Sequence, residues 1–298
     1  MTVLLLGKNG QLGRGLQRTL LPFGNLVAFA RDEFDLDKSE AIAGRLDAIR
    51  PDIIVNAAAY TQVDLAETDA DVAFRVNHQA VKALADYARR SDALLVHYST
   101  DYVFDGRQET PYRESDDTHP LNVYGESKRA GELAIAESCC RHLLFRTSWV
   151  VSADGTNFVK TILRLARERP NLRIVADQFG APTAVELLAD VTALAIVANR
   201  RGGLADGTYH LTASGRTSWH GLTRHIVQRA IEIGFVSVVD PADIEAITTE
   251  EFPRPAVRPR NSSLNTDALS SALGLTLPEW TVHVDRVLDQ LKERGWAL

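Results

Sequence analysis

The chain has 298 residues, of which 45% are hydrophobic and 24% are charged. This composition is typical of soluble globular proteins and excludes a disordered, fibrous or low-complexity chain. The formal net charge is −6, from 33 Lys and Arg against 39 Asp and Glu, which argues against a broad surface for nucleic acid, so we expect no nucleic-acid partner.

The first half of the chain alternates short apolar runs with longer amphipathic stretches. The runs predict strands at 3–6, 26–30, 53–56, 94–99 and 143–146, and the stretches predict helices at 10–20, 39–49, 66–90 and 122–137. This β-α-β-α order predicts an α/β fold, a Rossmann-like doubly wound parallel sheet with helices on both faces. Ligands of such sheets bind beyond the carboxyl ends of the strands.

The second half is less regular. It predicts helices at 155–168, 185–198 and 220–233, and strands at 172–175, 208–211 and 236–239. From Glu251 onward three prolines within 11 residues exclude a helix or a central strand, so this segment is interpreted as an extended surface or pocket-lining arm, with a plain linker as the alternative.

The length favours two domains. We expect a dinucleotide-binding domain at 1–148 and a smaller C-terminal α/β domain, mainly for substrate binding, at 149–298. Some segments of the second domain are expected to return to the first sheet.

Gly7, Gly10 and Gly13 form a G-x-x-G-x-x-G motif directly after the first predicted strand and at the start of the first helix. Glycines at this place allow a tight turn, bring backbone N–H groups close to a pyrophosphate and let the helix pack on the strand. The motif and its context predict dinucleotide binding, with a plain βα turn as the alternative.

The residues after the second strand bear on the choice of cofactor. NAD enzymes often place an acidic residue here on the ribose hydroxyls. This chain has Arg31, which could pair with a 2′-phosphate, so NADPH is favoured and NADH stays possible. The alternative is that Asp32 or Glu33 holds a bare ribose. Asp35 and Leu36 are expected to flank the adenine.

Tyr124 and Lys128 are four residues apart and therefore share one face of a predicted helix. Upstream, Ser99 and Thr100 place hydroxyls at the carboxyl end of a strand expected beside that helix. A tyrosine is a poor acid or base at neutral pH unless a cation and a hydroxyl lower its pKa. The three groups predict general acid catalysis by Tyr124, with an ordinary surface pair as the alternative.

Other catalytic and membrane signals are weak. The eight histidines show no metal-ligand spacing, so we expect no metal site. No stretch approaches the roughly 18 apolar residues that span a bilayer. The adjacent Cys139 and Cys140 cannot join distant segments and suit a reducing compartment. We expect a cytoplasmic protein without a membrane partner.

Taken together, these motifs resemble the extended short-chain dehydrogenase/reductase superfamily and, within it, the dTDP-4-dehydrorhamnose reductase family. The closer resemblance rests on six blocks, which lie at 7–13, 56–64, 99–106, 120–125, 146–149 and 258–262. These blocks extend over nearly the whole chain, and their combination is far more specific than any one of them.

The resemblance implies roles for matching positions only. The cofactor pyrophosphate would lie on Gly10, Gln11 and Leu12. The path toward the nicotinamide would be lined by Ala59, Tyr60, Thr61 and Tyr98.

It also implies the catalytic and sugar-binding groups. Tyr124 would donate the proton, and Lys128 would hold the ribose and lower the Tyr124 pKa. Thr100 would hydrogen-bond near the substrate carbonyl. Asp101 and Trp149 would face the sugar; their alternatives are a turn cap for Asp101 and an ordinary core position for Trp149.

The implied reaction is the NADPH-dependent reduction of dTDP-4-dehydro-β-L-rhamnose to dTDP-β-L-rhamnose, the last step of dTDP-rhamnose biosynthesis for cell-surface polysaccharide. One alternative is a nucleotide-sugar epimerase or dehydratase of the same superfamily; dehydratases usually carry two acids after the strand-end threonine, where this chain has only Asp101. Another is a non-catalytic NADP-binding regulatory subunit like that of methionine adenosyltransferase. The joint presence of Thr100, Tyr124 and Lys128 argues against that reading.

Some relatives bind Mg²⁺ through glutamates at a dimer contact. This chain has Gly15 where one of those glutamates stands, although Glu186 could match another. Because a lone carboxylate is a poor Mg²⁺ site, we expect a monomer or a weak homodimer rather than a metal-bridged dimer.

Overall fold

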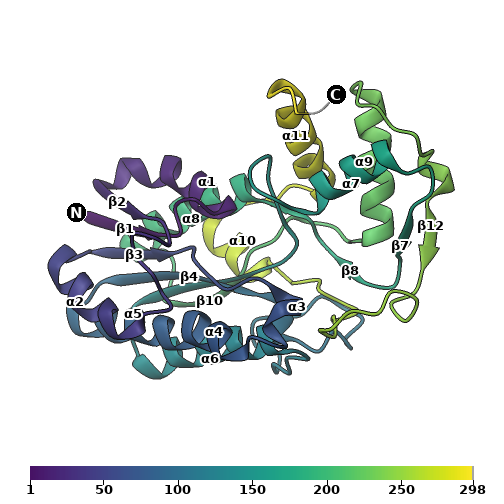
Figure 1. Ribbon diagram of the computed structural model, residues 1–298. Coiled ribbons are helices and arrows are strands. Elements are labelled where there is room, and N and C mark those ends of the chain that lie inside the picture. Colours follow the sequence, from purple (N-terminus) through teal and green to yellow (C-terminus); the bar gives the residue numbers. More distant parts are fainter. Residues whose placement is uncertain (297–298) are drawn as a thin grey trace.

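A computed structural model of the protein describes residues 1–296. Figure 1 shows two lobes side by side. The first lobe contains a central sheet. The second lobe is smaller and contains α7 (Phe158–Glu168), α9 (Trp219–Glu232), α11 (Trp280–Glu293), β7 (Arg173–Val175) and β12 (Glu245–Ile247).

The central sheet has six parallel strands in the order β10-β5-β4-β3-β1-β2. Their bounds are Thr2–Leu6 for β1, Asn25–Phe29 for β2, Ile53–Asn56 for β3, Leu94–Thr100 for β4, His142–Thr147 for β5 and Gly207–His210 for β10. The five strands predicted in the first half and the strand predicted at 208–211 are confirmed. Because all six run in one direction, their carboxyl ends meet at a single edge of the sheet.

Helices cover both faces of this sheet, as the doubly wound fold requires. The helices are α1 (Gln11–Leu20), α8 (Val185–Arg200) and α10 (Asp267–Leu273) on one face, and α2 (Ser39–Ile49), α5 (Ala80–Ser91) and α6 (Val123–Ser138) on the other. Alternate residues of β1 enter the two cores: Val3 and Leu5 pack with α1 and α8, and Leu4 and Leu6 pack with α2 and α5. A strand buried on both faces explains the uninterrupted apolar run at the start of the chain.

The helix predicted at 66–90 is divided. The chain forms α3 (Val63–Ala66) and α4 (Ala70–Phe74), and a π-helical turn at Arg75–Gln79 then leads into α5. That turn buries Asn77, whose amide hydrogen-bonds the backbone N–H of Tyr60 at 2.9 Å, the Tyr60 carbonyl at 3.0 Å and the Ser127 hydroxyl at 3.0 Å. These long-range bonds cannot be recognised from helical periodicity.

Two further predictions for the second half need correction. Helix α7 begins at Phe158 rather than 155, because Asn157 caps it and accepts from the Lys160 N–H. The segment 236–239 is not a strand; its Val238 N–H donates to the Ala166 carbonyl, and the strand that pairs with β7 is β12. Helices α10 and α11 were not predicted at all. The predicted helices that correspond to α8 and α9, and the predicted strand that corresponds to β7, are confirmed.

Short strands and turns complete the molecule. They are β6 (Val150–Val151), β8 (Phe179–Gly180), β9 (Thr183–Ala184), β11 (Thr217–Ser218) and the 3₁₀ turns Leu21–Phe23, Asp101–Val103 and Pro241–Asp243. None of the described helices is both long and apolar enough to cross a membrane.

The proline-rich segment after Glu251 is extended, as predicted, with no helix or strand between 251 and 260. It returns to the first lobe, where Arg258 pairs with Asp64 and the Ala256 N–H also donates to that carboxylate. Strand β10 likewise belongs to the first sheet although it follows residue 148. The division into two domains at residue 148 stays a prediction.

Candidate active site

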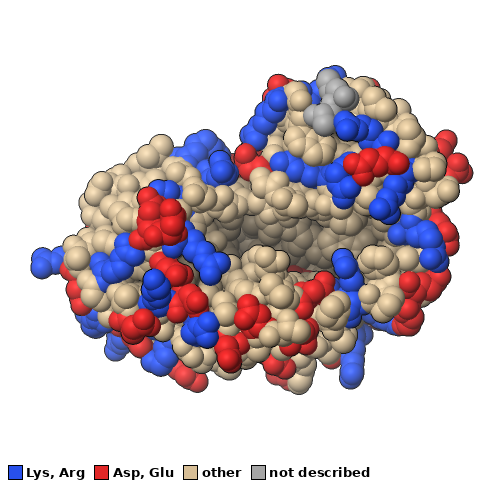
Figure 2. Space-filling model, in the orientation of Figure 1, with Lys and Arg blue, Asp and Glu red and all other residues tan. Residues whose placement is uncertain are grey.

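A cavity of about 540 Å³ lies at the carboxyl edge of the sheet. The glycine-rich loop and the segments after β2, β3, β4 and β5 line it. Figure 2 shows a hollow between the two lobes, with charged residues mostly on its rim. This is where the ligand of a doubly wound sheet is expected to bind.

The glycine-rich loop forms one wall of the cavity. Gly7 has φ +85°, and a Cβ there would lie 2.9 Å from the Ala58 nitrogen, so a larger residue would collide with the neighbouring strand end. Gly10, Gln11 and Leu12 also line the cavity, at the N-terminus of α1. Gly13 does not; it packs directly on the Gly7 carbonyl and holds helix and loop together. The loop fits a pyrophosphate, whose charge the helix N-terminus would stabilise.

The end of β2 contributes Arg31, Asp35 and Leu36 to the cavity. The Arg31 side chain is 77% exposed, and within residues 1–296 its one ion pair is a long one, 3.9 Å from Asp35, so it is available to an anion. Glu33, considered above as a ribose ligand, is already engaged: it accepts from the Ala30 N–H at 2.7 Å and pairs with Lys8 at 2.6 Å. These two contacts lower the Glu33 pKa.

The predicted path to the nicotinamide also lies in the cavity. Ala59, Tyr60, Thr61 and Tyr98 all line it. The Tyr98 hydroxyl is hydrogen-bonded to Thr192 at 2.7 Å, so helix α8, on one face of the sheet, holds this ring in place.

Tyr124, Lys128 and Thr100 all line the cavity. Tyr124 and Lys128 lie on α6, which closely approaches the 3₁₀ turn after β4 because Gly125 packs on the Tyr102 carbonyl; a Cβ at Gly125 would lie 2.3 Å from that oxygen. Burial raises the pKa of Tyr124 to about 12, against the lowering effect of a hydrogen bond with Thr100. The predicted lowering of the Tyr124 pKa by Lys128 is therefore wrong for this structure.

The surroundings of Lys128 explain that result. Its Nζ donates to the Tyr98 carbonyl at 2.6 Å and lies 3.4 Å from Nε2 of the buried His97. The ammonium is thus directed to the strand and not to the phenol. Burial lowers the pKa of Lys128 to about 8, although Glu132 opposes this.

Polar groups beside Thr100 face the same space. Asp101 is buried; its Oδ1 accepts from the Thr100 hydroxyl at 3.1 Å, and burial raises its pKa to about 6. Among the described residues no hydrogen-bond partner reaches Oδ2 of Asp101 or the hydroxyls of Thr147 and Ser148. Buried polar atoms without partners are costly, so their position in a cavity indicates a polar ligand.

Trp149 completes the wall toward the second lobe. It adopts φ +47°, which is unusual for a residue with a side chain. Its ring stacks on Trp219 with centroids 3.5 Å apart, and the backbone of Gly180 packs against its other edge. A strained residue fixed from several sides is typical of functional sites.

A second cavity, of about 590 Å³, includes in its lining the residue directly before Gly180. Phe179, which precedes Gly180, lines it together with four arginines: Arg107, Arg216, Arg258 and Arg260. The Arg216 guanidinium lies over the Phe179 ring, 4.2 Å from its centroid. Asp105, Glu109 and Asp177 line the same cavity, and three of the arginines already pair with carboxylates: Arg107 with Asp105, Arg258 with Asp64 and Arg260 with Glu250. Arg216 and the Phe179 ring are groups that can bind a phosphate and a planar base.

Comparison with known proteins places these features in one family. The family model described as RmlD substrate binding domain matches residues 1–293. The dTDP-4-dehydrorhamnose reductase of Escherichia coli K12 is 48% identical over 98% of both chains, and that of Burkholderia thailandensis is 47% identical over 95% of this chain and 97% of its own. The chain belongs to the dTDP-4-dehydrorhamnose reductase family.

Solved structures of this family have the same fold. The dTDP-4-dehydrorhamnose reductase of Clostridium acetobutylicum superposes with a TM-score of 0.89, at 33% identity over 98% of this chain and 100% of that one. The Bacillus anthracis enzyme, solved in complex with NADP, gives a TM-score of 0.86 at 34% identity over 97% and 99%. A UDP-glucose 4-epimerase of Thermus thermophilus, 19% identical, shares the fold alone, with a TM-score of 0.78.

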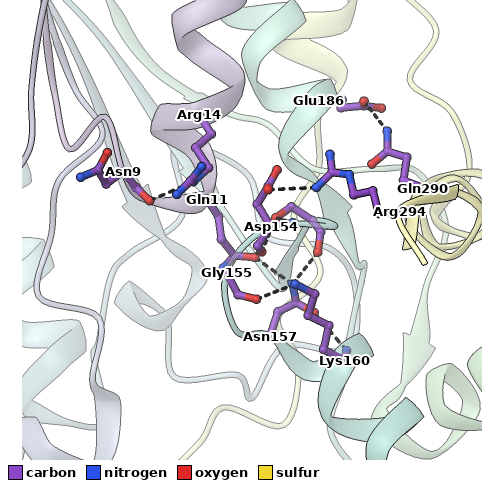
Figure 3. Close-up of polar contacts among 11 residues, drawn as sticks. Asn9, Gln11, Arg14, Asp154, Gly155, Asn157, Lys160, Glu186, Gln290 and Arg294 are labelled. Carbon is purple, nitrogen blue, oxygen red and sulfur yellow. Dashed lines mark hydrogen bonds and ion pairs between the residues drawn. The ribbon is translucent and has the colours of Figure 1, made fainter. Parts of the chain in front are cut away.

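The positions considered for Mg²⁺ in this family are otherwise occupied in this chain. Gly15 packs α1 against α8, where a Cβ would lie 2.8 Å from Val185. Glu186 pairs with Arg286 and accepts from Gln290 at 2.7 Å; Figure 3 shows the contact with Gln290. Within residues 1–296 no group of three or more His, Cys, Asp or Glu side chains could hold a metal ion.

Thr147 and Ser148 are among the cavity residues that were not predicted as site residues from sequence. Thr147 ends β5, as Thr100 ends β4, and Ser148 follows it. Both could have been predicted, because hydroxyl residues at the carboxyl end of a predicted parallel strand are expected at the edge of the sheet where ligands bind. The arginines of the second cavity had no such signal, since they come from segments far apart in the chain.

Proposed function

We propose that the protein reduces dTDP-4-dehydro-β-L-rhamnose to dTDP-β-L-rhamnose with NADPH as the reductant. The observation that carries this proposal is that Thr100, Tyr124 and Lys128 meet the glycine-rich loop in one cavity. The family relationship supports the sugar substrate, since relatives 47–48% identical over almost their full length are dTDP-4-dehydrorhamnose reductases.

The cofactor is held by three parts of the chain. The N–H groups at the start of α1 bind the pyrophosphate, and Lys128 binds a ribose of the nicotinamide half. Arg31 pairs with the 2′-phosphate, which favours NADPH over NADH. Bound NADPH supplies the hydride that reduces the keto group.

Tyr124 supplies the proton. Its pKa of about 12 keeps the phenol protonated at neutral pH, as a proton donor must be. The phenol donates to the oxygen of the keto group as negative charge develops there, and the Thr100 hydroxyl stabilises the same oxygen. The ketone, NADPH and one proton thus give the alcohol and NADP⁺.

The remaining groups bind the substrate. Asp101 and the unpartnered hydroxyls of Thr147 and Ser148 hydrogen-bond the sugar hydroxyls, and Trp149 packs against the ring. Arg216 of the second cavity binds the diphosphate. The non-catalytic alternative is disfavoured because a binding subunit has no need of the assembled Thr100, Tyr124 and Lys128.

The test is anaerobic incubation with NADPH and dTDP-4-dehydro-6-deoxy-L-sugar, followed by the absorbance of the reduced nicotinamide and by product analysis. We expect stoichiometric oxidation of NADPH and formation of a 6-deoxy-L-hexose nucleotide. A matched incubation without the sugar gives the background. Absence of sugar-dependent oxidation by folded, NADPH-binding protein would reject the proposed function.

A further inference from the structure

The side chain of Gln11 connects the two lobes. Gln11 is the first residue of α1, at the cofactor wall, yet its side chain does not point into its own lobe. Its Oε1 accepts from Nδ2 of Asn157 at 2.9 Å and from the hydroxyl of Ser152 at 3.1 Å (Figure 3 labels Gln11 and Asn157). Both donors lie in the loop 152–157, more than 140 residues along the chain.

This loop is fitted closely to Gln11. Gly155 adopts φ +64°, and a Cβ there would lie 3.0 Å from Cγ of Gln11, so the backbone of the loop packs directly on the glutamine side chain. Inside the loop the one hydroxyl hydrogen of Ser152 is shared between Oε1 of Gln11 and the Asp154 carbonyl, which lies 2.8 Å away. The second hydrogen of Asn157 Nδ2 goes to the Ser152 carbonyl at 2.6 Å. The loop is therefore a compact unit that presents two donors to one acceptor.

The same loop is attached to the second lobe and to the substrate wall. Asn157 caps α7 through its Oδ1, and Asp154 pairs with Arg294 beyond α11 at 2.9 Å (Figure 3). The loop follows β6, which follows Trp149 directly. Movement of the loop relative to Gln11 would thus move the second lobe and Trp149 relative to the cofactor.

We propose that Gln11 is a positioning residue for the sugar: through Ser152 and Asn157 it holds the loop 152–157, and with it Trp149, at a set distance from the cofactor. The role attributed to Trp149 rests on the proposed function. The hydrogen bonds of Gln11, and the order that they impose on the loop 152–157, do not depend on the proposed function. A separate backbone contact with the cofactor pyrophosphate is compatible with this role, because the side chain faces the loop.

The chain offers matched variants. Gln11→Leu removes the acceptor at similar size, and Gln11→Glu keeps an acceptor oxygen at this place. Gln17→Leu is the control, since Gln17 lies on the same helix and, within residues 1–296, donates to the Lys8 and Gly13 carbonyls of its own lobe. Ser152→Ala removes one donor.

The control for Ser152→Ala is Ser237→Ala. Ser237 makes the same local turn, donating to the Val239 carbonyl at 2.8 Å and accepting from the Val239 N–H at 3.3 Å. Its hydroxyl also lies 3.4 Å from the Ala166 carbonyl of the second lobe, so the variant reports the loss of the same turn and of one long contact that does not involve Gln11.

The first readout is hydrogen exchange in the cofactor-free protein. We expect the amides of 152–157 to exchange about fivefold faster or more in Gln11→Leu, because hydrogen bonds that hold the loop are lost, and at the wild-type rate in Gln11→Glu and Gln17→Leu. Equal exchange in wild type and Gln11→Leu would overturn the proposal, whether or not the protein reduces the sugar.

The second readout separates sugar binding from cofactor binding. Ser152→Ala should raise KM for the sugar nucleotide about three- to tenfold while the Kd of NADPH stays within about twofold, and Ser237→Ala should change neither. The double variant Gln11→Leu with Ser152→Ala should raise KM no further than the worse single variant. Additive effects, or an equal rise in KM for Ser237→Ala, would assign Ser152 a merely structural role and overturn the proposal.

Discussion

Nζ of Lys128 lies 2.6 Å from the carbonyl oxygen of Tyr98, two residues before Thr100. This bond ties helix α6, which carries Tyr124, to strand β4, which ends at Thr100. The Tyr124 phenol and the Thr100 hydroxyl are thus positioned relative to one another by a buried contact that involves neither of them.

The role of Tyr124 is tested by Tyr124→Phe, which keeps the ring and removes the proton. We expect turnover to fall about 10²- to 10⁴-fold while the Kd of NADPH and the thermal midpoint change little. Thr100→Val should cost less, about tenfold, because it removes one hydrogen bond. Steady-state kinetics and cofactor titration measure both. Wild-type turnover by Tyr124→Phe would exclude it as the acid and revive the regulatory-subunit alternative.

Lys128 should give the reaction a pH dependence. Its pKa of about 8 means that the ammonium loses its proton as the pH rises through that value, so the contact with the cofactor weakens above it. We expect KM for NADPH to rise between pH 7 and pH 9 in the wild type. In Lys128→Met, KM for NADPH should be high and independent of pH over the same range. A retained rise in Lys128→Met would place the titrating group elsewhere.

Arg31 should determine the choice of cofactor. A charge-assisted pair with the 2′-phosphate contributes roughly 1.5 to 3 kcal/mol, so Arg31→Ala should weaken NADPH binding about tenfold or more and leave NADH binding nearly unchanged. Glu33→Gln is a useful comparison, because Glu33 is engaged with Lys8 and the Ala30 N–H. Equal losses for NADPH and NADH in Arg31→Ala would show that it does not bind the phosphate.

Asp101 should lower the free energy of unfolding at neutral pH. Its folded pKa of about 6 exceeds the ordinary 3.8, so the folded state favours the protonated carboxyl, and the free energy of unfolding falls as the pH rises from about 4 through 6. Asp101→Asn should therefore be more stable than wild type at pH 8, by about 1 to 3 kcal/mol, and not at pH 4. Urea unfolding at both pH values measures this, and a lower stability of the variant at pH 8 would contradict it.

Metal removal should have no effect. Because Glu186 is occupied by Arg286 and Gln290, and Gly15 has no carboxylate, we expect EDTA to leave activity unchanged. Light scattering after size exclusion should show a monomer or weak homodimer both before and after treatment. Dissociation of a dimer by EDTA would show that a metal is bound through other residues.

Local sequence patterns were enough to predict the sheet and the glycine-rich wall of the cavity. The apolar runs that form β1 to β5, and the glycines at 7, 10 and 13, are local patterns whose meaning depends on neighbours a few residues away. The assignment of Thr100, Tyr124 and Lys128 to one place followed from helical spacing and from the shared edge of parallel strands.

The direction of the pKa shifts in the site depended on tertiary packing. The pKa of Tyr124 is raised, not lowered, because burial outweighs the hydrogen bond with Thr100 and because Lys128 is directed to Tyr98. Burial is a sum over everything packed around a group, and motif spacing carries no information about it.

The long-range side-chain contacts also depend on tertiary packing. The π-helical turn that buries Asn77, the pairing of Arg258 with Asp64 and the bonds of Gln11 to Ser152 and Asn157 join residues 17 to 194 positions apart. Each such side chain is chemically suited to many partners, and only the folded chain brings one of them within hydrogen-bond distance. Local sequence therefore determined which groups exist and on which element, while packing decided which of them act on one another.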